Sequence, residues 1–148
     1  MAKAIQEKEM LMTLLIGRWE HVSRKIADLA AALPAEKLEA QLVPDSRTPG
    51  AVIRHVAFWN GYLADSLLGK EPNGDANELP LSEYSTQASM LEALKQSSDE
   101  VAALLREASM NFKTAELVTS FIEHTSEHYG QLAVYARLTG VVPPASRT

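Results

Sequence analysis

The sequence predicts an all-α protein that folds as a four-helix bundle, and three observations lead to this prediction. Four long stretches carry apolar residues at spacings of three and four, the period of a helix with one buried face. No stretch alternates apolar and polar residues as a half-buried strand does. The connections are mostly short, which suits helices that pack side by side. With 148 residues in the chain, we expect residues 1–148 to form a single helical domain.

The first expected helix covers residues 4–33 and ends at Pro34. Its apolar residues form one stripe that we expect to face the core: Leu11, Leu15, Trp19, Val22, Ile26, Leu29 and Leu33. Residues 35–40 form a possible short helix. Thr48 followed by Pro49 has the form of an N-cap and a proline at the first helical position. The second helix is therefore expected to begin there and to run to about Leu68, before Gly69.

Residues 70–81 are rich in turn-forming residues and have no periodicity, so they are expected to form the longest loop. A third helix is expected from near Ser82 to about Ala108. The fourth covers about Thr114 to Thr139 and ends before Gly140 and the prolines that follow.

The composition narrows the classes of function. The formal net charge is −5 and no basic patch is visible, which argues against nucleic acid as the main partner. The chain has no cysteine, so a disulfide framework, a thiolate metal site and a cysteine nucleophile are excluded. Neither a signal-peptide core nor a stretch of membrane-spanning length is present, and we expect a soluble cytoplasmic protein.

Three of the four histidines are candidate metal ligands. His124 and His128 are four residues apart, which places them about 40° apart around a helix axis and about 6 Å along it. They share the apolar face of the fourth helix, and His55 shares the apolar face of the second. Inward ligands from facing helices are how metal sites in bundle cores are built. Three imidazoles would suit zinc, nickel, copper or iron and would leave coordination positions free.

Alternatives remain open at this point. Each inward histidine can equally be a core residue that is hydrogen-bonded to a neighbour or to water. Gln131, one turn after His128, fits either a hydrogen bond to a ligand or packing of the bundle end. Glu127 fits a solvated helix surface better than a role in orienting a ligand. Trp59 fits core packing better than the wall of a substrate pocket, and His21 is expected at the surface.

The C-terminal segment HTSEHYGQLAVYARLTGVVPP resembles the closing helix of the DinB-like (DinB/YfiT-type) metal-binding bundles. The matching elements are the pair of histidines, the Gly130-Gln131 that follows, Leu138, Gly140 and Pro143-Pro144. The segment SRTPGAVIRHVAFWNGYLADSLLG is similar to the family's second helix, whose single histidine corresponds to His55. The order of elements matches across most of the chain.

This resemblance implies an up-down-down-up bundle, often a homodimer, that binds a divalent ion through His55, His124 and His128. Known activities in the family include transferases and isomerases that use a low-molecular-weight thiol, which the metal activates. It therefore implies a metal-dependent enzyme, with zinc or nickel as the ion, that transfers a thiol to a small electrophile. Gln131 and Tyr129 are possible pocket residues. The alternatives are a non-catalytic metal-binding stress or ligand-binding protein and a metal-dependent hydrolase.

Overall fold

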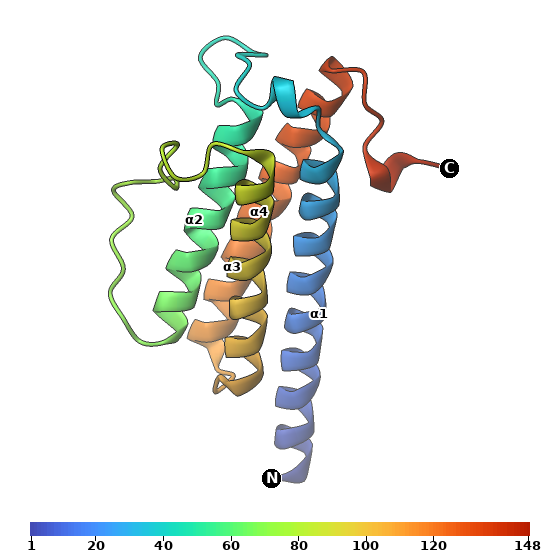
Figure 1. Ribbon diagram of the computed structural model, residues 1–148. Coiled ribbons are helices and arrows are strands. Elements are labelled where there is room, and N and C mark those ends of the chain that lie inside the picture. The colour runs from blue at the N-terminus through green and yellow to red at the C-terminus, as the bar shows by residue number, and fades with distance from the viewer.

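The computed structural model describes all 148 residues and contains four long helices and no strand. The helices are α1 (Ala2–Ala32), α2 (Pro49–Leu67), α3 (Gln87–Glu107) and α4 (Phe112–Leu138). Two short 3-10 helices, Ala35–Lys37 and Pro144–Ser146, follow α1 and α4. Figure 1 shows α1 and α4 running in one direction and α2 and α3 in the other, which is the up-down-down-up order. The predicted all-α bundle is confirmed.

The start of α2 is confirmed residue by residue. The hydroxyl of Thr48 accepts a hydrogen bond from the backbone N–H of Ala51 at 3.1 Å, and Pro49 takes the first helical position. Gly69 follows the helix with a φ of 76°, a left-handed conformation that glycine adopts without steric cost. These local signals fix the ends of the helix that carries His55.

The predicted start of α3 near Ser82 is wrong. The backbone N–H groups of Glu83 and Tyr84 both donate to the carbonyl of Pro80, so this segment closes a turn instead of a helix. The helix begins at Gln87, where Thr86 and Ser89 cap each other reciprocally. The start of α4 is also earlier than predicted, because Asn111 is the N-cap and accepts from the N–H of Thr114 at 3.0 Å.

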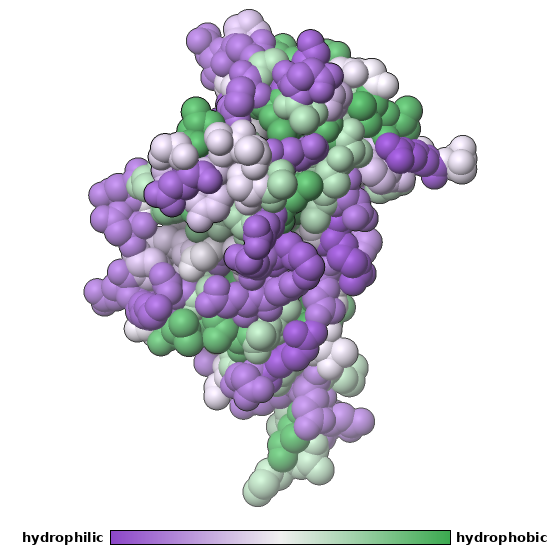
Figure 2. Space-filling view, in the orientation of Figure 1, coloured by the Kyte–Doolittle hydropathy of each residue, from purple (hydrophilic) through white to green (hydrophobic).

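The core follows the predicted stripe of α1 with one exception. Trp19 is fully buried, and its indole N–H donates to the carbonyl of Ser98 at 3.0 Å, which ties α1 to α3. Leu11 was expected to be in the core but is 39% exposed. The N-terminal part of α1 extends past the end of the bundle (Figure 1), so its apolar side chains meet solvent there. Figure 2 shows hydrophobic surface on this projecting end. Ile5, near the start of α1, is 53% exposed.

A part-buried ion pair holds the connection between α1 and α2 in place. The guanidinium of Arg54 is 3% exposed and donates to both carboxylate oxygens of Glu39, at 2.6 and 3.3 Å. The backbone N–H of Gly50 donates to the carbonyl of Leu38 at 2.7 Å, and a Cβ at Gly50 would overlap the Glu39 carboxylate. A larger residue at this position would displace the Glu39 carboxylate, so Gly50 allows the connection to lie against the first turn of α2.

The long connection between α2 and α3 runs back along the bundle beside α2 (Figure 1). The backbone N–H of Leu79 donates to the carbonyl of Arg54 at 3.3 Å. Asn77, two residues earlier, has a φ of 59°, which asparagine tolerates better than most residues. This anchoring places Asn77 next to His55.

Candidate metal centre

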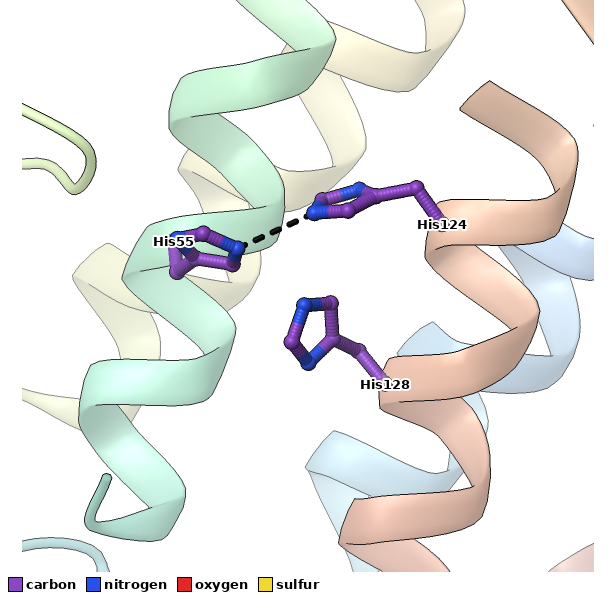
Figure 3. Close-up of side chains that lie close together, drawn as sticks. All are labelled: His55, His124 and His128. Atoms are coloured by element: carbon purple, nitrogen blue, oxygen red, sulfur yellow. Dashed lines mark hydrogen bonds between the residues drawn. The ribbon is translucent and has the colours of Figure 1, made fainter. Parts of the chain in front are cut away.

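The structure brings together the three histidines that the sequence singled out. His55 comes from α2, and His124 and His128 come from α4 (Figure 3). One nitrogen of each ring lies within 4.8 Å of those of the other two. The Nε2 atoms of His55 and His124 are 3.0 Å apart, and the ring centroid of His128 is 4.6 Å from each of the other two.

The ring of His55 is oriented by the loop before α3. Its Nδ1 donates to the backbone carbonyl of Asn77 at 2.6 Å. A carbonyl only accepts hydrogen bonds, so Nδ1 carries the proton of the neutral ring. The lone pair of His55 therefore lies on Nε2, which faces His124 and His128 (Figure 3).

The ring of His128 is oriented by the next turn of its own helix. Its Nδ1 lies 2.9 Å from the side-chain oxygen of Gln131, which accepts the Nδ1 proton. The amide nitrogen of Gln131 donates to the hydroxyls of Tyr135 and Ser46 at 3.0 and 3.2 Å. The Tyr135 hydroxyl donates in turn to the carbonyl of Arg47 at 2.8 Å. This chain of bonds fixes the Gln131 amide and leaves Nε2 of His128 free for the centre.

His124 differs from the other two because its Nδ1 is buried and has no hydrogen-bond partner. Its Nε2 faces Nε2 of His55, an atom that bears a lone pair. In the neutral ring, a proton on Nε2 of His124 makes this contact a hydrogen bond to the lone pair of His55. A cation bound between the two nitrogens would take the place of that proton.

Burial keeps His55 and His124 neutral. It lowers the pKa of His55 from 6.5 to about 4; the bond to Asn77 opposes the shift, and electrostatic repulsion from Arg47 and the neighbouring His128 adds to it. Burial is also the main cause that lowers the pKa of His124 to about 4, followed by His128, His55 and Arg47. At pH 7 both rings are therefore uncharged, the form that binds metals.

The donor set fits a divalent ion. Metal–nitrogen bonds of about 2.0–2.1 Å place two nitrogens that share an ion roughly 3 Å apart. The 3.0 Å separation between His55 and His124, which is also that of an N–H···N hydrogen bond, is compatible with this value, and the nitrogen of His128 lies within 4.8 Å of both. The ligand cluster contains three histidines and no carboxylate. Three protein ligands leave coordination positions open, as in catalytic sites.

The histidines lie in a cleft of about 410 Å³. It is lined by His55, Trp59, Asn77, Ser120, Phe121, His124 and His128. A larger groove of about 780 Å³ runs between α1 and α3, but none of the histidines lines it. The smaller cleft is therefore the one that a substrate of the metal centre would enter.

Of the other residues considered from the sequence, some contact the cleft or the histidines and some lie elsewhere. Gln131 orients His128, and Trp59 lines the cleft, contrary to the core packing expected for it. Glu127 and His21 are exposed, as expected. Tyr129 does not line the cleft: its ring lies under the ammonium group of Lys25, 4.2 Å from the centroid.

Sequence reasoning did not find Asn77 or Ser46. Asn77 acts on His55 through its backbone carbonyl, which has no signature in the side-chain sequence. The signal available was weak: asparagine in a loop is a candidate for a left-handed conformation. Ser46 reaches Gln131 across 85 positions of sequence separation, which no local pattern reveals.

The fold and these three histidines define a helical bundle with a candidate metal centre. The family model described as DinB family matches residues 6–147, and the chain belongs to this family. A comparison with curated proteins finds no significant match. None of the helices combines the length and the apolar character needed to cross a bilayer.

Proposed function

We propose that the protein binds one divalent metal ion through His55, His124 and His128. The observation that carries this proposal is the convergence of three imidazole rings on an open cleft, with burial keeping two of them neutral. Asn77 and Gln131 support it, because metal-bound histidines commonly donate their second ring N–H to such acceptors. Membership in the DinB family, which the sequence resemblance describes as one of metal-binding bundles, points the same way.

We further propose that the protein is an enzyme that transfers a low-molecular-weight thiol to a small electrophile. A divalent ion bound to three neutral ligands supplies Lewis acidity and lowers the pKa of a thiol that binds to it. The chain itself would orient the ligands through Asn77 and Gln131. Its aromatic side chains, Trp59 and Phe121, would exclude water from one side of the cleft.

Two alternatives are weaker. A hydrolase needs a group that moves protons during attack by water, and no carboxylate lines the cleft. A non-catalytic ligand-binding protein would use the same cleft without turnover. From the resemblance to the family we also propose zinc or nickel as the ion and a homodimer as the assembly. From the composition of the sequence we propose the cytoplasm as the location.

Metal analysis of protein purified without an affinity tag tests the metal site. After reconstitution, we expect about one ion per chain in the wild type and in His21→Ala, which removes an exposed histidine. His55→Ala and His128→Ala should each lose stoichiometric metal, because two ligands hold an ion far less tightly than three. Wild-type protein that binds no zinc or nickel would overturn the proposal.

Thiol consumption tests the reaction. Metal-loaded protein should accelerate the loss of a cellular thiol in the presence of a model electrophile, and His128→Ala should reduce the rate to background. A panel of several thiols is needed, because the residues of the cleft do not select one. Stoichiometric metal without acceleration for any thiol would favour the binding protein.

A further inference from the structure

Aromatic rings gather at one side of the three histidines. The ring centroids of Trp59 and Phe121 each lie 6.3 Å from that of His124. Tyr62 packs behind them, stacked on Phe121 at 6.2 Å and tilted against Trp59 at 4.8 Å. All three are half-buried, and Trp59 and Phe121 face the cleft itself. We call Trp59 and Phe121 the aromatic wall.

The ring of Trp59 is held in place on two sides. Its indole N–H donates to the side-chain oxygen of Asn77 at 2.9 Å. A Cβ at Gly74 would lie 2.8 Å from Cη2 of the indole, so the backbone of the loop packs against the opposite edge of the ring. The polar atom of the indole is thereby satisfied, and what Trp59 presents to the cleft is apolar.

Asn77 and helix α4 connect the aromatic wall to the three histidines. Asn77 accepts from Trp59 with its side chain and from His55 with its backbone carbonyl. Phe121 precedes His124 by three residues on α4, so the two side chains lie on one face of that helix. The distance between wall and histidines is therefore fixed by short, local connections.

The lining of the cleft contains few polar side chains besides the histidines. Apart from the histidines and Asn77, the only polar side chain in the cleft is Ser120, and no charged residue lines it. Half-exposed aromatic rings gain free energy when an apolar surface covers them, and they prefer flat partners in stacked or edge-to-face arrangements. A volume of about 410 Å³ is near the lower end of the range for small-molecule sites.

We propose that the substrate of this centre carries an aromatic or other flat apolar group, which packs against Trp59 and Phe121 while its polar reacting group faces the histidines. This inference rests on the proposed metal site and adds the class of substrate. It makes Trp59 and Phe121 residues that determine specificity.

Two small metal-binding probes test the inference, because they share one head group and differ in one ring. Benzohydroxamate carries a phenyl group where acetohydroxamate carries a methyl group. With zinc-loaded wild-type protein, we expect benzohydroxamate to bind at least tenfold more tightly, equivalent to about 1.4 kcal/mol. In Phe121→Ala the ratio should fall to threefold or less. The matched control is Phe112→Ala, which removes an 81% exposed ring from the same helix and should keep the wild-type ratio.

Tryptophan emission gives a second readout that does not depend on turnover. The chain has two tryptophans, and Trp19 is fully buried beside Ser98. Binding of benzohydroxamate should change the emission of Trp59 in the wild type. In Trp59→Phe, which retains an aromatic ring, only Trp19 remains and the emission should stay constant.

The outcomes separate the two proposals. If both hydroxamates bind zinc-loaded protein with equal affinity, or if Phe121→Ala keeps the wild-type ratio, the metal site stands and the aromatic wall is refuted. If the wild type takes up no zinc, the metal site fails, and the inference about the substrate fails with it. A tenfold preference that Phe121→Ala abolishes supports both.

Discussion

Replacing Gln131 by methionine should weaken metal binding without removing a ligand. Gln131 accepts the Nδ1 proton of His128, which fixes the lone pair on Nε2 and the angle of the ring. Methionine has a similar length and no hydrogen-bonding oxygen of comparable strength. The ring of His128 would then be free to rotate and to exchange its proton between the two nitrogens.

The expected loss is about ten- to a hundredfold in affinity, or roughly 1.4–2.7 kcal/mol, the effect typical of removing the partner of a metal-bound histidine. We expect the upper part of this range. Gln131 is itself held by two further bonds, to Tyr135 and Ser46, so the wild-type ring is strongly oriented. Gln131→Glu keeps an oxygen acceptor for the Nδ1 proton but loses the amide donor to Tyr135 and Ser46, so it should lose less affinity than Gln131→Met.

Competition with a chromophoric chelator at pH 7.5 measures these affinities. Gln96→Met is a matched control, because the amide of Gln96 bonds only to Glu92 on the exposed face of α3. Thermal unfolding of metal-free protein shows whether each variant is folded. If Gln131→Met binds metal as tightly as the wild type while His128→Ala does not bind it, the reasoning about orientation is refuted.

Two predictions concern stability. The pKa of His55 and His124 is lowered from 6.5 to about 4, so between these values the unfolded chain binds more protons than the folded one. The free energy of unfolding of metal-free protein should therefore fall as pH decreases from about 6.5 to about 4. Urea titrations at several pH values should show that the free energy of unfolding of His124→Gln depends less on pH than that of the wild type. An equal pH dependence in the two proteins would contradict this prediction. Glu39→Ala leaves the buried Arg54 unpaired and should destabilise the protein by about 2 kcal/mol in the same assay, whereas a change below about 0.5 kcal/mol would contradict a structural role.

The helices were predictable where a local signal sets their ends. Thr48 and Pro49 begin α2 as the sequence indicates, because a cap depends on residues within one turn. The start of α3 was predicted near Ser82, whereas the capping box that forms is Thr86 with Ser89. Where this helix begins depends on how the long connection packs, which periodicity does not reveal.

The exposure of Leu11 shows that helical periodicity alone does not predict burial. Its position on the apolar stripe of α1 is correct, but α1 extends past the helices that would cover it. Periodicity determines which face of a helix is apolar. It does not determine how far along that face the neighbouring helices reach.

The histidines were predictable because the helical period places His124 and His128 on one face and His55 on the inner face of another helix. The residues that orient these histidines were less predictable from the sequence. Gln131 is one turn from His128 and was a candidate, whereas Asn77 contributes a backbone carbonyl from a loop without periodicity. The aromatic character of the cleft also escaped prediction, because an apolar ring at an inward position is usually a core residue.

The sequence by itself determined that the chain is a four-helix bundle with three histidines on inner faces, because both follow from the helical period and from local caps. Only the tertiary structure decided that the three rings meet within 4.8 Å, that Asn77 and Gln131 orient two of them, and that Trp59 faces an open cleft. These features join segments that are distant in sequence, and their geometry is set by packing between helices and by the path of a loop, which no local pattern encodes.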